Sequence, residues 1–119
     1  MSAETDLYAV LSGRAQLTAL VGSRIYPDAI PEGDVLPAVV YQRIMTSPIT
    51  TIGNVTVAEE VHFGVTAWAE TRTASDAVAD EIAAALSASV NPMSDRHGGF
   101  DSEVGLHAPT VECYWWHTF

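Results

Sequence analysis

The chain contains no lysine and only one cysteine among its 119 residues, and each shortage excludes a type of chemistry. Without lysine, neither a Schiff base nor the lysine of a phosphate-binding P-loop can be present. Cys113 has no partner for an intrachain disulfide, and a single thiol does not build a zinc site alone. This cysteine content is compatible with a reducing cytoplasm.

Targeting signals are missing as well. The first six residues carry Glu4 and Asp6 and lack the basic start of a signal peptide. No apolar run approaches the ~20 residues that cross a bilayer. We therefore expect a chain that stays in the cytoplasm of the producing cell until it joins an assembly.

Positive charge is scarce, because five arginines stand against fifteen acidic residues and give a net charge of −10. Such a charge repels nucleic-acid phosphates and anionic membrane surfaces. It keeps a protein soluble, and it also suits a basic partner or a surface that DNA must pass without sticking. With 48% hydrophobic and 17% charged residues, the composition is that of a globular protein. The length fits one domain over residues 1–119.

Hydrophobic periodicity predicts two helices. The first spans residues 5–21 and ends at Gly22, a residue that favours the left-handed position after a helix. The second spans residues 74–88, with Thr73 as its N-cap. Turn residues and β-formers predict strands between and after them, at residues 38–45, 60–69 and 108–119, and weaker ones at 24–26 and 90–100.

Alternation within residues 60–69 separates two faces of the predicted sheet. Val61, Phe63, Val65 and Ala67 share the face expected to meet the helices. The order of elements predicts an α+β fold, with an antiparallel or mixed sheet of about four strands and two helices packed on one face.

Three aromatic residues lie at alternate positions of the predicted strands and point away from the predicted core. They are Trp68, Tyr114 and Trp116. Large aromatic side chains on an uncovered face are typical of an interface. The alternative is a second apolar layer, covered by loops of the same chain such as residues 23–37. Residues 46–56 interrupt the strand pattern and predict a long hairpin arm, in which Pro48, Ile49 and Ile52 are further interface candidates.

Residue types that bind zinc occur in the second half of the chain, namely Asp95, His97, Asp101, His107, Cys113 and His117. On a strand, Cys113 and His117 would lie ~13 Å apart along one face, too far to share one ion. No G-x-S-x-G elbow accompanies the serines and histidines. We therefore assign no catalytic, metal-binding or cofactor-binding residue and expect no enzymatic activity.

Several strings in the sequence together resemble a known family. They are VGSRIYP at residues 21–27, LPAVVYQR at 36–43, VTAWA at 65–69 and YWWH at 114–117. In order and spacing they are similar to the tail completion, or tail terminator, proteins of long-tailed bacteriophages and gene transfer agents. The resemblance covers nearly the whole chain and is weakest over residues 91–108.

The resemblance implies a structural virion protein without a cofactor. Such proteins form a ring, typically hexameric, at the head-proximal end of the tail tube. The implied partners are further copies of the chain, the tail tube protein and the head–tail connector protein, with DNA only as passing cargo. We expect some acidic residues to face the ring's lumen, with Asp28, Glu32, Asp34, Glu59 and Glu60 as candidates.

Three other interpretations stay open at this point. A head-closure or connector protein of the same particle would share the size and acidity. A small metal-dependent hydrolase would use His97, Asp101 and His107. A dimeric binding module would use the aromatic face as a pocket.

Overall fold

The computed structural model describes residues 3–31, 35–88 and 93–118. Within these ranges it contains three helices and seven strands. The helices are α1 (Ala3–Ser12), α2 (Ala15–Val21) and α3 (Arg72–Ser87). The strands are β1 (Ile25–Pro27), β2 (Ala38–Thr50), β3 (Thr56–Trp68), β4 (Met93–His97), β5 (Phe100–Asp101), β6 (Leu106–His107) and β7 (Thr110–Thr118).

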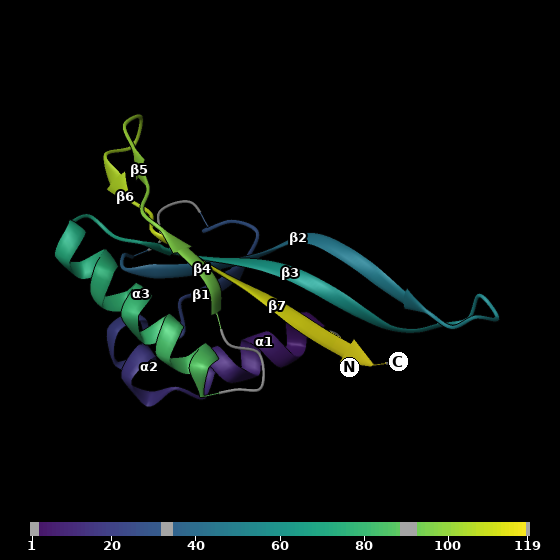
Figure 1. Cartoon of the computed structure of the whole chain (residues 1–119). Helices are drawn as coiled ribbons and strands as arrows, with labels where there is room; N and C mark the ends of the chain where they lie inside the picture. The colour runs from purple at the N-terminus through teal and green to yellow at the C-terminus, as the bar shows by residue number, and fades with distance from the viewer. Residues whose placement is uncertain (1–2, 32–34, 89–92, 119) are drawn as a thin grey trace.

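Five strands form one mixed sheet in the order β1-β2-β3-β7-β4. β1 runs parallel to β2, and the other neighbours are antiparallel. The helices lie on one face of this sheet, and β5 and β6 form a small hairpin that projects from the body (Figure 1). The predicted α+β class is confirmed, although both the helices and the strands are more numerous than the sequence pattern predicted.

The single helix predicted over residues 5–21 is wrong, because the chain breaks between α1 and α2. Leu7 and Leu11 are four residues apart and share a face, as do Leu17 and Val21, and all four side chains are buried. These four residues would also fit the apolar face of one helix, so the break has a local cause at Gly13 and Arg14. Glycine is unfavourable inside a helix, and Arg14 has an extended backbone with φ −88° and ψ 107°. The break lets α2 reorient, and Gly22 then ends it with a φ of 61°.

Helix α3 begins earlier than predicted. Its N-cap is Thr71, whose hydroxyl accepts a hydrogen bond from the backbone N–H of Ala74 at 3.2 Å, and Thr73 lies inside the helix. Both residues are threonines with apolar periodicity after them, so local sequence does not distinguish them. Which threonine becomes the N-cap depends on where β3 ends and on the direction in which the chain then enters α3.

The core lies between the helices and the sheet. The predicted face of β3, with Val61, Phe63, Val65 and Ala67, is fully buried in it. In β7 the residues of the same face, such as Cys113, are also buried. Alternation in the sequence therefore predicted correctly which side of the sheet meets the helices.

Strands β2 and β3 are much longer than predicted and pair as far as Thr50 and Thr56. Beyond the body of the protein they form a two-stranded arm (Figure 1). A register shift between Arg43 and Met45 leaves Ile44 as an extra residue where the arm begins. Such a bulge bends a ribbon and increases its twist. Within the described residues, no helix is long and apolar enough to cross a membrane.

Candidate assembly surfaces

The most unusual surface of the protein is the arm, residues 44–58. Its first part pairs with residues 58–62 of β3, beside β7, and only the part beyond Ala58 is two-stranded. The arm is 15 residues long and contains no Asp, Glu, Arg or His, in a chain with a net charge of −10. Many of its large apolar side chains are exposed, including Ile44, Met45, Ile52, Val55 and Val57. Exposed apolar surfaces of this kind are typical of sites that contact another protein.

The three interface candidates in the arm occupy different places on it. Pro48 and Ile49 lie in β2, where Pro48 is exposed and Ile49 is half-buried. Pro48 pairs in register with Glu59 of β3. Ile52 lies in the turn between the strands and is fully exposed. Ile52 is therefore the apolar residue at the tip of the arm.

A cluster of charged side chains holds the base of the arm against α1. Arg43 donates hydrogen bonds from Nε to Oε2 of Glu4 at 2.9 Å and from Nη2 to the other carboxylate oxygen of Glu4. The side-chain hydrogen bond to Arg43 lowers the pKa of Glu4, and the same bond raises the pKa of Arg43. Arg43 also lies 3.5 Å from Glu59, whose carboxylate is 3.3 Å from Nδ1 of His117. This network joins β2, β3 and β7 to the first helix.

The second candidate surface is the face of the sheet that the helices leave uncovered. Tyr114 and Trp116 lie on it and are 48% and 53% exposed. The ring of Tyr114 stacks on that of His62, with centroids 4.6 Å apart. The carboxylate of Glu112 lies between His62 at 2.8 Å and His97 at 3.2 Å. This face thus combines exposed aromatic rings with a row of polar side chains.

Trp68 has a different environment from the other two aromatic candidates. It is half-buried and lines an apolar hollow of about 340 Å³ together with Ile30, Val40, Val104 and Leu106. Segments from the loop after β1 and from the β5–β6 hairpin thus lie beside it. The sequence left two interpretations of the three aromatic residues, an interface or a layer covered by the chain's own loops. Trp68 is partly covered by such loops, whereas Tyr114 and Trp116 are exposed to solvent.

The acidic candidates are dispersed rather than gathered. Asp28 is exposed directly after β1, with a φ of 64°. Glu60 lies on the uncovered face, in register with Trp116 on β7. Glu59 belongs to the cluster at the base of the arm. Glu32 and Asp34 lie outside the described residues.

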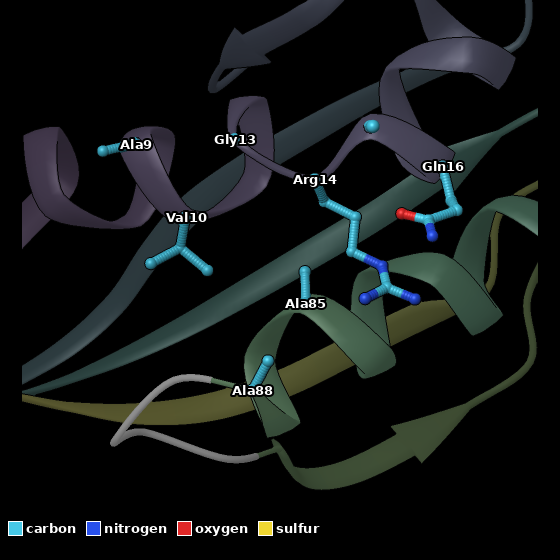
Figure 2. A pocket seen from close by; sticks show the side chains of 8 residues that line it. Ala9, Val10, Gly13, Arg14, Gln16, Ala85 and Ala88 are labelled. Carbon is cyan, nitrogen blue, oxygen red and sulfur yellow. The ribbon is translucent and has the colours of Figure 1, made fainter.

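A groove on the helical side was not predicted from the sequence. It has a volume of about 520 Å³ and lies between the α1–α2 junction and the end of α3 (Figure 2). Its lining is mostly small, with Ala9, Val10, Gly13, Ala85 and Ala88. Small residues recur in helices for many reasons, so only the packing of α1 against α3 shows that these leave a hollow.

One charged side chain lines the groove. Arg14 extends from the α1–α2 junction toward α3 (Figure 2). Its Nε donates a hydrogen bond to Oε2 of Glu81 at 3.0 Å, and both side chains are about three-quarters buried. Arg14 therefore joins the two walls of the groove while its guanidinium remains at the edge.

The candidate metal ligands are distributed over different parts of the fold. Cys113 is buried on the helical side of the sheet, where desolvation raises the pKa of its thiol to about 12. His97 lies on the uncovered side with Glu112, and His107 packs against Phe100 in the small hairpin. Over residues 3–31, 35–88 and 93–118, no three His, Cys, Asp or Glu side chains come together as metal ligands would.

Comparison with known proteins supports the family identified from the sequence strings. The model of the family described as "Tail completion protein gp17" matches residues 5–115. No curated protein matches the chain.

A chain in a solved structure entitled "Virion of native gene transfer agent (GTA) particle" shares the fold. Its TM-score is 0.76 and its sequence identity 18%, over 95% of this chain and 92% of that chain. At this identity the likeness establishes the fold alone.

Proposed function

The chain belongs to the family of bacteriophage tail completion proteins, and from this premise we propose that it forms a ring at the head-proximal end of the tail tube. It is a structural component of a virion, and the role that we propose for it includes no catalytic step. In this role the ring ends polymerisation of the tube and offers a docking surface to the head connector. A hexamer is the symmetry that we expect. The chain acts as one domain, assembled into the particle in the cytoplasm of the bacterial host.

The observation that carries this proposal is the uncharged apolar arm. Burying a side chain such as Ile or Met stabilises a contact by about 1.5–3 kcal/mol. The exposed residues of the arm contribute this stabilisation only when another protein covers them and removes their surface from water. In this proposal the arm at one end of each copy contacts an unlike surface of the next copy, which is the type of contact that builds rings.

The uncovered aromatic face supplies a second contact in our proposal. Trp116 and Tyr114 are half-exposed, so their removal changes an interface more than the core. We expect Trp116→Ala to weaken ring formation more than folding. Assembly in particles and thermal unfolding are measured on the same variant. A variant that unfolds at a much lower temperature but still assembles contradicts the interface role.

Some of the acidic candidates face the lumen in this proposal, where negative charge prevents DNA from binding as it passes. The candidates are the same five carboxylates as before, Asp28, Glu32, Asp34, Glu59 and Glu60. A structure of the assembled ring tests the idea. A lumen lined by Arg14, Arg24 or Arg72 would overturn it.

Deletion of the gene from the encoding phage or element tests the function directly, with tail length measured by negative-stain electron microscopy. Overlong tails without heads are expected, because nothing then stops the tube or joins it to the head. Tails of normal length that fail to attach would assign the chain to the connector instead. Normal infectious particles would overturn both roles.

A further inference from the structure

A contact between copies of this chain must overcome strong electrostatic repulsion. Each copy carries a net charge of −10, so surfaces that meet are expected to be those without acidic residues. The two longest stretches without Asp, Glu or Arg are residues 44–58 and residues 82–94. The first is the arm, and the second begins in the last turns of α3 and contributes Ala85 and Ala88 to the groove.

The arm and the groove cannot meet within one molecule. The arm extends from the body at the far end of β2 and β3, away from the helical layer in which the groove lies (Figure 1). The arm of one copy can therefore reach only the groove of another. Because each copy has one arm and one groove, such contacts run head to tail and close into a ring when the rotation between copies permits.

The two surfaces also complement each other in shape. Ile52 is fully exposed at the turn of the arm, with Gly53 beside it, so that its branched side chain protrudes. The groove is an open depression of about 520 Å³, lined by four alanines and Gly13 together with Val10, Arg14 and Gln16. A protruding aliphatic side chain fits a hollow of small residues.

Arg14 adds a polar feature at the edge of the groove. Its guanidinium has five N–H donors, and Nε uses one of them on Glu81. In the turn at residues 51–55 the carbonyl oxygens of Thr51 and Val55 already accept hydrogen bonds within the turn, and a carbonyl oxygen can accept a second bond from such a donor. An uncharged turn thus suits this groove without disturbing the Arg14–Glu81 ion pair.

We propose that the arm tip of one copy, led by Ile52, docks into the groove between α1 and α3 of the next copy. The inference rests on the proposed ring and specifies the contact that closes it. The partner is a second copy rather than the tube protein, since one of the two longest uncharged stretches forms the arm and the other supplies Ala85 and Ala88 to the groove.

Cross-linking in assembled particles tests the contact. Ile52→Cys and Ala9→Cys together place one thiol at the arm tip and one on an exposed wall of the groove. The native Cys113 does not interfere, because it is buried and its thiol pKa is raised to about 12. A short bismaleimide is expected to produce a ladder of linked multimers that ends at the number of copies in the ring.

Two controls make the result specific. Ile52→Cys alone can form at most linked pairs. Ile52→Cys with Val104→Cys carries its second thiol on an exposed residue of the turn between β5 and β6, outside the groove, and is expected to give no ladder. Particles that contain the Ile52–Ala9 pair of cysteines but show no linked multimers would overturn the arm–groove contact and leave the ring intact. Absence of the chain from particles of the unsubstituted virus would instead overturn the proposed function.

A charge at the arm tip gives a second test. Ile52→Asp would bury an unpaired carboxylate in the contact, so incorporation of the chain into particles is expected to fall more than about tenfold. Ser102→Asp adds the same charge at an exposed position in the turn between β5 and β6, outside the groove and the hollow beside Trp68, and is expected to keep incorporation unchanged. Equal incorporation of the two variants would contradict the proposal.

Discussion

The substitution Glu4→Gln removes the charge that anchors Arg43, and with it the arm, to the first helix. Two hydrogen bonds join the pair, and bonds to charged groups contribute about 1.5–3 kcal/mol when well buried. The side chains here are 30% and 38% exposed, so solvent screening reduces this contribution. We therefore expect Glu4→Gln to lower the free energy of unfolding by about 1 kcal/mol and the Tm by roughly 4 °C.

The pH dependence of this effect has a definite sign. Because Arg43 lowers the pKa of Glu4 below its usual 4.5, the folded state favours the ionised carboxylate. The stabilisation is fully present above pH 4.5 and is lost as the pH falls through the lower pKa of the folded state. The difference between wild type and Glu4→Gln should therefore disappear on acidification.

Urea denaturation followed by tryptophan fluorescence measures the effect, since Trp115 is buried in the core. A double-mutant cycle with Arg43→Gln isolates the coupling between the two side chains, expected at about 1 kcal/mol at neutral pH. Asp76→Asn is the matched control, because its pairs with Arg72 at 3.8 Å and Arg96 at 4.0 Å are long and its side chain is 49% exposed, so that it is expected to contribute less than about 0.5 kcal/mol. A coupling near zero at neutral pH, or one that persists in acid, would refute the reasoning.

Three further predictions concern the core, the thiol and a helix cap. Phe63→Ala should lower the free energy of unfolding by about 3–5 kcal/mol in urea titrations, because the ring is fully buried. Cys113 should react with a thiol reagent only when the protein unfolds, since it is buried and its pKa is raised to about 12; rapid labelling of the native protein would disprove this. Thr71→Ala should cost about 1 kcal/mol by losing the bond to Ala74, whereas Thr73→Ala should cost much less.

Periodicity in the sequence predicted the elements that have one apolar face. Residues 61, 63, 65 and 67 alternate, and their side chains are buried as alternation requires. Gly22 ended its helix as expected, because a left-handed φ favours glycine. Periodicity failed for the first helix, because the buried residues of α1 and α2 also fit one apolar face and the break at Gly13 leaves that pattern intact. It failed for the cap of α3 because Thr71 and Thr73 look alike locally.

The candidate site was predicted less completely than the fold. The sequence identified the aromatic residues and the arm segment as interface candidates, and the structure shows that Tyr114, Trp116 and Ile52 are exposed. It did not reveal that strand pairing continues to Thr50, because Pro48 within the strand suggested a loop. Proline is tolerated on a strand that has a partner on one side only, and this condition depends on the whole sheet.

By itself the sequence determined the charge, the absence of lysine chemistry, the α+β class and the family, because these depend on composition, short-range periodicity and local strings. Only the tertiary structure decided where the arm begins, which aromatic residues stay open and where a groove forms. Each of these depends on residues far apart in the chain, such as Arg43 with Glu4 and Ala9 with Ala85. Local patterns describe which face of an element is apolar, whereas the packing of several elements decides which apolar surface remains uncovered.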